Sequence, residues 1–431
     1  MSDPVIVERA AHSLSRSQID PDALKVLYRL HQNGHVAYLV GGSVRDLLLG
    51  RRPKDFDVGT SAHPYQVKRL FKNCWVIGRR FRLAHVRFGT KTIEVATFRR
   101  KVTAEELAAA EEALAAEQND APDDDRPPDR LAHRENTFGT PEEDAFRRDF
   151  TINALFYDIG SFAIIDYTGG LEDLRTGLVR SIGDPVERFH EDPVRMLRAI
   201  AMAARLGFMI DPPIDTAIAD HRGEIARSAP ARLIEEFYKL LRSGASERAF
   251  RMMAERKLLE PIAHDLQKGA TDRLWRSLAA VDAYRKRHDE IPDTLSNAVL
   301  LGSLLVPLGI AGHPGHSRKT ELEKEPRLSL GMLPLARRDI ERFRQILGLQ
   351  RRLLDPRLSP RARRALMYRG PFREALTWLE IHGEAPEAVE HWRGFIEAAG
   401  VAERDQQGSE DLPPRRHRRR RRRRSFRPAT N

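Results

Sequence analysis

Hydrophobic residues near the start of the chain recur at a spacing that predicts a helix. Ala23, Val26, Leu27 and Leu30 follow one another at intervals of three and four residues. This spacing places all four on one face of a helix, which we expect over residues 20–34. The helix therefore has one face available for packing against a core.

Shorter apolar runs follow this helix and predict strands. Residues 36–40 form a short apolar run that is typical of a strand, and the glycine pair Gly41-Gly42 then turns the chain. Residues 43–49 suit one or two helical turns, and residues 56–58 read as a second short strand. The order strand, glycine turn, helix and strand indicates a mixed α/β region.

The pattern changes again further along the chain. Residues 85–88 and 92–98 are two β-like arms around a turn at Gly89, which predicts a hairpin. From about residue 190 onward the spacing is helical, with few strand signals. The sequence therefore predicts an α/β head followed by a long all-helical part.

Charge is distributed unevenly. The chain has 431 residues and a formal net charge of +11, but residues 415–427 contain ten arginines and no acid, so the remainder carries about +1. Such a run predicts a disordered basic arm, because like charges repel and offer little to bury. Residues 101–135 are rich in Ala and Glu and then in Asp and Pro, which predicts a mobile acidic insertion.

Composition also excludes several classes of protein. The single cysteine, Cys74, permits neither an intrachain disulfide nor a cysteine zinc cluster. The longest uncharged apolar stretch, residues 297–312, is shorter than the ~20 residues of a spanning helix and contains Pro307, so we expect a buried core helix there and no membrane span. The N-terminus lacks the apolar run of a signal peptide, so we expect a cytoplasmic protein.

Two aspartates follow the glycine turn, at Asp55 and Asp57. If Phe56 lies on a strand, the two carboxylates point to the same face and repel each other unless a cation sits between them. Hard divalent ions are bound by one or two carboxylates together with substrate phosphates. Two such ions ~3.5–4 Å apart can hold the attacking and leaving oxygens of a phosphoryl transfer. The alternative is an ordinary surface turn.

The surroundings of the two aspartates favour a phosphate site. Gly41-Gly42 lets the backbone approach a ligand closely, and the amides at the start of the following helix can bind phosphate. Arg45 adds a cation. Glu94 lies on a nearby candidate strand, where it is either a third carboxylate of the site or a surface charge of the hairpin.

The stretch from residue 39 to residue 58, "LVGGSVRDLLLGRRPKDFDV", resembles the head motif of the class II nucleotidyltransferases, which are the bacterial poly(A) polymerases and the tRNA CCA-adding enzymes. The resemblance implies a polymerase-β-like palm followed by a helical neck, body and tail. It implies that Asp55 and Asp57 hold two Mg²⁺ ions, with Mn²⁺ as an alternative, and that a triphosphate is seated by the residues of the turn and helix: Gly41, Gly42, Ser43 and Arg45.

A second stretch, residues 147–158, resembles the second head motif of this family. The resemblance places Arg147, Arg148 and Asn153 against the sugar and phosphates of the nucleotide. The alternative is a buried strand with basic flanks.

A third stretch, residues 190–208, contains the family's E-D-x-x-R pattern at Glu191, Asp192 and Arg195. The resemblance implies that these residues read the base, since a carboxylate accepts from an exocyclic amino group and a guanidinium donates to the neighbouring ring nitrogen. Adenine and cytosine both fit. The resemblance places Arg198 at the phosphates, whereas Asp192 followed by proline is also a favourable helix start.

Three features favour the poly(A) polymerase branch over the CCA-adding branch. Residues 76–86 resemble a stretch typical of bacterial poly(A) polymerases, as do residues 135–153 and 231–241. That branch also often carries a basic C-terminal extension. The arginines of the arm that we expect to contact RNA phosphates are Arg415, Arg416, Arg418, Arg419 and Arg420. Such runs can instead be solvated or recruit acidic proteins.

We therefore expect a template-independent polymerase that adds AMP from ATP to RNA 3′ ends and releases pyrophosphate. Its partners are RNA 3′ ends and ATP, with RNA-decay or RNA-chaperone proteins as further candidates for the arm. The alternative enzyme is a tRNA CCA-adding nucleotidyltransferase. A non-catalytic RNA-binding protein is a second class, which the intact aspartate pair disfavours.

The expected divisions are an N-terminal extension over 1–19, the head over 20–165, a neck over 166–245, a helical body and tail over 246–405, and the disordered arm over 406–431.

Overall fold

The computed structural model describes residues 3–78, 82–101, 137–310 and 329–408. Most of the predicted acidic insertion and of the predicted arginine arm lies outside the described residues. The chain divides into two compact units. One holds a mixed sheet and helices up to α14, the other holds α16 to α19, and α15 (Asn297–Leu305) contributes residues to both.

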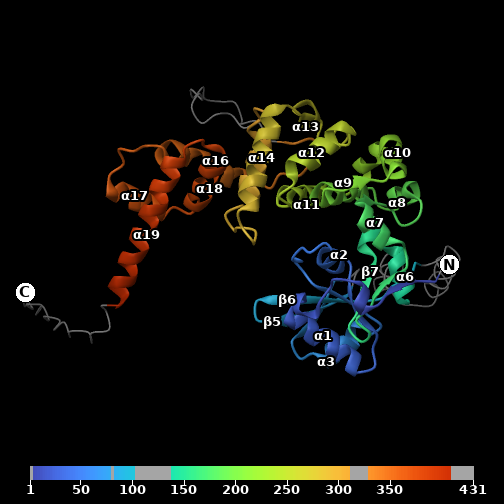
Figure 1. The fold of residues 1–431 in the computed structure, drawn as a ribbon. Helices are drawn as coiled ribbons and strands as arrows, with labels where there is room; N and C mark the ends of the chain where they lie inside the picture. The colour runs from blue at the N-terminus through green and yellow to red at the C-terminus, as the bar shows by residue number, and fades with distance from the viewer. Residues whose placement is uncertain (1–2, 79–81, 102–136, 311–328, 409–431) are drawn as a thin grey trace, which may run out of the picture. The chain divides into compact units, whose positions relative to one another are not determined.

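An eight-stranded sheet forms the core of the head (Figure 1). All neighbouring strands in it are antiparallel except β3 and β6, which are parallel. In order across the sheet the strands are β1 (Val5–Val7), β8 (Ile164–Asp166), β7 (Leu155–Asp158), β2 (Ala37–Val40), β3 (Asp57–Thr60), β6 (Lys91–Thr97), β5 (Leu83–Phe88) and β4 (Cys74–Ile77).

The predicted first helix is present as α1 (Pro21–Gln32). Asp20 caps it, because its side chain accepts hydrogen bonds from the N–H groups of Asp22 and Ala23, and Pro21 occupies the first helical position. The four residues of the predicted apolar face are buried. Together with α3 (Pro64–Leu70), α1 covers one side of the sheet (Figure 1).

The predicted strand before the glycine pair, the helix after it (α2, Gly42–Leu48) and the hairpin of β5 and β6 are confirmed. One boundary is wrong. β3 begins at Asp57, so Phe56 and Asp55 lie in the coil before the strand, because β2 pairs with β3 only from Asp57 onward. A contribution that the pattern did not predict comes from the N-terminal extension, whose Val5–Val7 pairs with β8 at the sheet edge.

Helices make up most of the remaining described residues, as predicted. Within the first unit the later elements are α6 (Pro141–Arg147), η3 (Thr151–Asn153), α7 (Gly170–Thr176), β9 (Leu178–Val179), α8 (Pro185–Glu191), α9 (Val194–Leu206), β10 (Met209–Ile210), α10 (Pro212–His221), η4 (Arg222–Arg227), α11 (Pro230–Leu241), α12 (Ser246–Glu255), α13 (His264–Lys268) and α14 (Asp272–Lys286). The second unit contains α16 (Arg337–Leu353), α17 (Pro360–Met367), α18 (Phe372–His382) and α19 (Pro386–Gly408).

The apolar stretch at 297–312 begins with α15, in which Val299, Leu300 and Leu301 are fully buried. This confirms the expectation of a core helix. Across the described residues, no helix has both the length and the apolar character needed to cross a membrane.

Candidate active site

Asp57 and Glu94 are neighbours on the two parallel strands of the sheet. Val58 pairs with Val95, so the residues directly before them, Asp57 on β3 and Glu94 on β6, lie side by side and point to the same face. Both are solvent-accessible. Asp55 lies in the coil two residues earlier, with its side chain 72% exposed and 3.8 Å from the ammonium of Lys54.

The pKa of Asp57 is raised to about 6. Burial of the carboxylate by surrounding protein is the largest cause, and the negative charges of Glu94 and Asp55 add to it, while Arg148 acts in the opposite direction. The negative charges of Glu94 and Asp55 thus act on Asp57, while Lys54 lies 3.8 Å from Asp55 and His85 lies 3.7 Å from Glu94. A divalent cation would offset these negative charges, so these residues fit a metal site of the kind that the sequence predicted.

The three carboxylates are not gathered around a single point. Among the described residues, the only group of three or more histidine, cysteine or acidic residues with ligand atoms within 4.8 Å of one another is His190, His221 and Glu224. A hydrogen bond of 2.9 Å between His190 and Glu224 accounts for part of that proximity.

The glycine turn has a shape that only glycine adopts readily. Gly41 has φ of 70° and stands directly before α2, and its N–H donates to the carbonyl of Leu155 at 3.1 Å. A Cβ placed on Gly41 would lie 2.9 Å from Nη1 of Arg148. Absence of a side chain at Gly41 thus lets the guanidinium of Arg148 lie against the turn.

Ser43 and Arg45 lie behind the turn rather than on its exposed side. The hydroxyl of Ser43 donates to the carbonyl of Val40 at 3.0 Å, and Arg45 is only 2% exposed. The guanidinium of Arg45 donates to Asp46 at 2.6 and 2.8 Å and to the side-chain oxygen of Asn153. A Cβ placed on Gly42 would lie 3.4 Å from this guanidinium, so the side chain of Arg45 packs directly against the turn.

Residues of the second motif connect the turn to the helical part of the first unit. Nδ2 of Asn153 donates to Asp149 at 3.2 Å, and Nη2 of Arg198 lies 2.6 Å from the other carboxylate oxygen of Asp149. Burial alone would raise the pKa of Asp149, but the charge of Arg198 and the hydrogen bonds that the carboxylate accepts lower it overall. Arg147, the last residue of α6, is half-buried.

Arg148, also of the second motif, is held by Asp144. Its Nε and Nη2 donate to one carboxylate oxygen of Asp144 at 3.2 and 2.9 Å, and its Nη1 donates to the carbonyl of Asn153 at 3.1 Å. The side chain remains 25% exposed and influences the pKa of Asp57. Arg148 is therefore the cation that the structure places between the turn and the carboxylates.

The third motif spans the end of α8 and the start of α9. Glu191 forms ion pairs with Lys101, Arg188 and Arg195 at 2.5, 3.1 and 2.9 Å. Burial alone would raise the pKa of Glu191, but hydrogen bonds from these three cations lower it to about 2. Glu191 is consequently ionised at neutral pH, and Arg195 is fixed at the first turn of α9.

Asp192 has two structural partners. Its carboxylate accepts from the N–H of Val194 at 3.3 Å and also accepts two hydrogen bonds, of 2.9 and 2.6 Å, from Arg232. The predicted helix start is one residue early, because Pro193 stands at the N-cap of α9 and the helix begins at Val194, although Asp192 still serves the first N–H of the helix. Sequence reasoning assigned no role to Arg232. The sequence did contain a signal for Arg232. It lies in the first turn of α11, where a cation opposes the helix dipole, just as Arg195 does in the first turn of α9.

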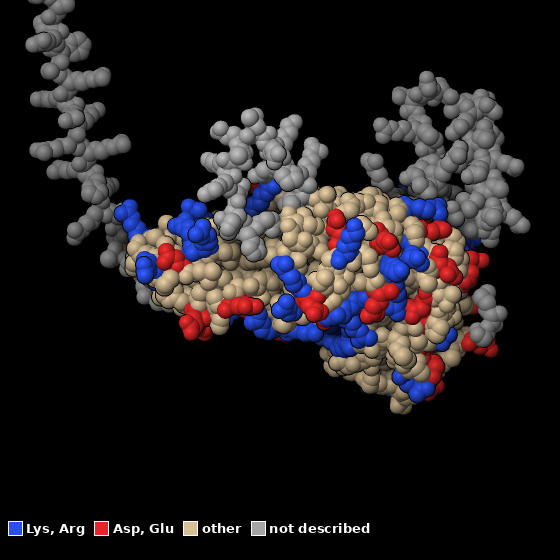
Figure 2. Space-filling view, turned by 90° about the horizontal axis from the view of Figure 1, so that it is seen from above, with Lys and Arg blue, Asp and Glu red and all other residues tan. Residues whose placement is uncertain are grey.

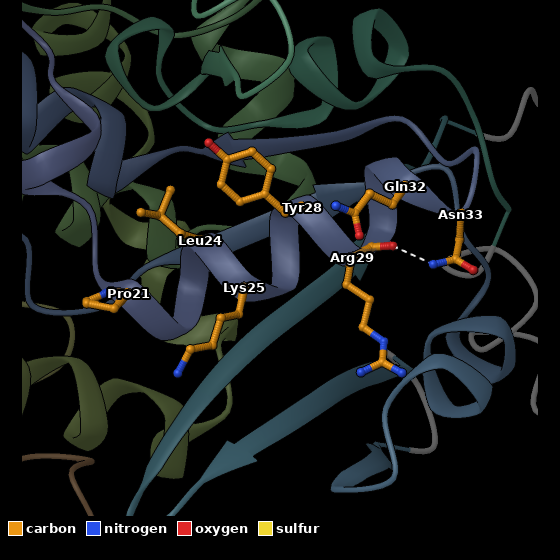
Figure 3. Close-up of a pocket in the computed structure, with 7 residues that line it drawn as sticks. All are labelled: Pro21, Leu24, Lys25, Tyr28, Arg29, Gln32 and Asn33. Atoms are coloured by element: carbon orange, nitrogen blue, oxygen red, sulfur yellow. Dashed lines mark hydrogen bonds between the residues drawn. The ribbon is translucent and has the colours of Figure 1, made fainter.

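Two surface features complete the description. The hollow in Figure 3 runs along one exposed face of α1 and contains none of the predicted site residues; its lining consists of Pro21, Leu24, Lys25, Tyr28, Arg29, Gln32 and Asn33. Basic and acidic side chains are interspersed on the face shown in Figure 2. The predicted RNA-contacting arginines from Arg415 to Arg420 lie outside the described residues.

Family models match three parts of the chain. Residues 37–180 match the poly(A) polymerase head domain, and residues 207–268 match the probable RNA- and SrmB-binding site of polymerase A. Residues 330–426 match the arginine-rich C-terminus of polymerase A. The chain belongs to the poly(A) polymerase family of nucleotidyltransferases. The family predicted from the motifs is thereby confirmed.

Individual members of this family are similar over much of the chain. Poly(A) polymerase I of Salmonella typhi is 48% identical over 257 residues, which is 60% of this chain and 53% of the relative. The CCA-adding enzyme of Lactobacillus helveticus is 36% identical over 240 residues, which is 56% of this chain and 54% of the relative. The chain thus spans about half the length of the curated relatives it matches.

A solved structure from the family confirms the fold. The crystal structure of the CCA-adding enzyme of Bacillus stearothermophilus in complex with CTP matches with a TM-score of 0.61 and 28% identity. The match covers 88% of this chain and 83% of that one. The α/β head followed by a helical part is therefore an architecture of the family.

Proposed function

We propose that this protein is a template-independent polymerase that adds AMP from ATP to RNA 3′ ends and releases pyrophosphate. The observation that carries the chemistry is the placement of Asp57 beside Glu94, with Arg148 close enough to both the glycine turn and Asp57 to affect them. This arrangement sets carboxylates for a metal next to a cation for phosphates, which is what phosphoryl transfer requires.

Asp55, Asp57 and Glu94 would hold divalent ions, two Mg²⁺ in the expected case or Mn²⁺ in their place. When bound, such ions lower the pKa of the attacking 3′-hydroxyl and neutralise charge on the leaving pyrophosphate. The raised pKa of Asp57 supports this assignment, because burial and the neighbouring charges of Glu94 and Asp55 all disfavour an ionised carboxylate that has no cation bound to it. With metals in that role, no side-chain base is needed.

The triphosphate would be bound by the turn and by the cations around it. Gly41 and Gly42 add no side chain to the turn, and the guanidinium of Arg148 lies against Gly41. The side chain of Arg198 is 45% exposed although it pairs with Asp149, so its guanidinium has donors left for phosphate. Arg147 joins this group through the family resemblance. The burial of Arg45 and Ser43 supports a role in fixing the turn rather than in contacting the nucleotide.

Base recognition would fall to Asp192 and Arg195, with Glu191 holding Arg195 in place. The two hydrogen bonds from Arg232 use one lone pair on each oxygen of Asp192, so the carboxylate keeps acceptor capacity for an exocyclic amino group. Arg195 would donate to the neighbouring ring nitrogen. This pair accepts adenine or cytosine and rejects guanine and uracil.

ATP addition to general RNA is favoured over CCA addition by two comparisons. Identity to the poly(A) polymerase of Salmonella typhi is 48%, against 36% to the CCA-adding enzyme of Lactobacillus helveticus. The arginine-rich C-terminus also matches a polymerase A model. We propose RNA 3′ ends as substrate, the cytoplasm as compartment, and RNA-decay or RNA-chaperone proteins as further partners of the arm.

The test is incubation of the pure protein with Mg²⁺, a non-tRNA oligoribonucleotide and each nucleoside triphosphate in turn. Long extension with ATP alone is expected, and Asp57→Asn serves as the inactive control. Addition confined to tRNA that lacks its end, with both CTP and ATP, would establish the alternative. RNA binding without any incorporation would point to a non-catalytic protein.

A further inference from the structure

A row of side chains crosses the sheet from the carboxylates to the edge strand. Asp57 lies beside Glu94, Glu94 pairs with His85 on β5, and His85 pairs with Trp75 on β4. Residues paired in register point to the same face of a sheet. Trp75 therefore shares its face with the catalytic carboxylates, three strands away.

Among the described residues, two large apolar side chains on that face are exposed at the edge of the sheet. Trp75 is 52% exposed, and Ile77, two residues further along the same face, is 50% exposed. The opposite face carries Val86 and Val95, both buried, on the side where α1 and α3 pack. Trp75 and Ile77 thus form an exposed apolar patch on the face that carries the carboxylates, and such a patch marks a candidate binding surface.

The geometry of the reaction decides what this face would bind. The glycine turn follows β2, which flanks β3 on the side away from β6, so a triphosphate bound at the turn, as proposed above, would lie on that side of Asp57. In an in-line displacement the attacking oxygen approaches opposite the leaving pyrophosphate. The RNA 3′ end must then arrive from the side of β6, across β5 and β4.

We infer that Trp75 is a stacking platform for bases near the 3′ end of the RNA substrate. This inference rests on the proposed function. Neighbouring strands are ~4.8 Å apart, so Trp75 is about 14 Å from Asp57, which equals about four nucleotides at the ~3.4 Å rise of a stacked strand. Stacking accepts any base, which suits an enzyme that extends RNAs of different sequence.

Intrinsic fluorescence can report this contact directly. The other three tryptophans, Trp275, Trp378 and Trp392, are 8, 6 and 2% exposed, so Trp75 is the tryptophan that RNA can reach. A six-nucleotide oligoadenylate, added without ATP at 0.5 M salt to suppress phosphate contacts by the arm, should quench the emission of the full chain. The quenching should disappear in Trp75→Phe, whose ring still stacks, while binding measured by anisotropy persists.

Affinity is the second readout. Trp75→Ala should weaken binding of the oligonucleotide by about 5- to 150-fold, the range given by loss of one stacked base. The KM for ATP should not change, because Trp75 lies on the RNA side of the carboxylates. Tyr65→Ala is the matched control, since Tyr65 is 58% exposed on α3, which packs on the opposite face of the sheet, and should leave RNA binding unchanged.

The outcomes separate this inference from the proposed function. Unaltered RNA affinity and RNA KM in Trp75→Ala, with ATP incorporation intact, would overturn the platform and leave the polymerase. RNA binding that depends on Trp75, in a protein that incorporates no nucleotide, would support the platform and overturn the polymerase. An equal loss in Tyr65→Ala would also overturn the platform, because it would show a general effect of removing surface aromatics.

Discussion

Arg198 on α9 and Asp149 before η3 form a salt bridge of 2.6 Å. This contact joins α9, whose start carries the proposed base-reading residues, to the motif that carries Asn153. The side-chain oxygen of Asn153 in turn accepts a hydrogen bond from Arg45, which packs against the glycine turn. A continuous chain of polar contacts thus sets the position of the turn relative to α9.

Neutralising Asp149 should lower stability in a pH-dependent way. The pKa of Asp149 is below its ordinary value, so the ionised carboxylate stabilises the fold above about pH 4 and loses that contribution as pH falls through the lowered pKa. Asp149→Asn should reduce the free energy of unfolding by about 1–2 kcal/mol at pH 7, since Arg198 is partly exposed. Urea denaturation of the wild-type protein and of Asp149→Asn at pH 7, 5 and 3 measures this loss of stability. A difference in the free energy of unfolding that stays constant down to pH 3 would contradict the prediction.

Asp57→Asn should abolish nucleotide addition and stabilise the metal-free protein. The raised pKa means that ionised Asp57 costs free energy above about pH 6, and that this cost is relieved as pH falls toward 4. Removing the charge should raise the free energy of unfolding by about 1 kcal/mol at pH 7.5. This is less than the full pKa shift of Asp57 implies, because solvent reaches the carboxylate. Thermal melts with and without Mg²⁺ test this. Wild-type protein should gain stability from Mg²⁺, less so at pH 5, and the variant should not.

Gly41→Ala should damage activity more than Gly50→Ala. Both glycines have positive φ, of 70° and 67°, but Gly41 combines it with a ψ of −129°, a region that is essentially restricted to glycine, so Gly41→Ala strains the backbone by about 1–3 kcal/mol. Only at position 41 does the new Cβ meet another group, the guanidinium of Arg148 at 2.9 Å. We expect a lower melting temperature in Gly41→Ala than in Gly50→Ala, and a KM for ATP at least tenfold higher when both are assayed at a temperature at which they are folded. Equal KM values would show that Arg148 does not act at the turn.

Most of the head could be predicted because its signals are local. The spacing of Ala23, Val26, Leu27 and Leu30 fixed one helix face, and the glycine pair marked the turn. What escaped prediction depends on contacts distant in sequence. Strand β1 exists only because residues 5–7 meet β8, and the burial of Arg45 depends on partners at Asp46 and Asn153. The start of β3 at Asp57 is set by its pairing partner Val40, which spacing alone does not reveal.

Asp192→Ala should relax the choice of nucleotide as well as remove a helix cap. Losing the cap costs about 1 kcal/mol, because the N–H of Val194 loses its acceptor. Asp184→Ala is the matched control, since Asp184 caps α8 through the N–H of Val186 and lies outside the motif. We expect GTP and UTP incorporation relative to ATP to rise in Asp192→Ala and Arg195→Ala but not in Asp184→Ala. A shared loss of stability with unchanged selectivity would leave Asp192 as a cap only.

Deleting residues 409–431 should weaken RNA binding and flatten its dependence on salt. The segment removed holds ten arginines, and each phosphate contact releases counterions, so fewer are released per complex without it. The loss should be similar for RNAs of different sequence, because phosphate contacts carry no direct base information. The KM for ATP should barely change, since the turn, Arg148 and the carboxylates remain. Binding across a salt titration compares the full and shortened chains. An unchanged slope would show that the arm does not contact RNA and would favour a protein partner for it.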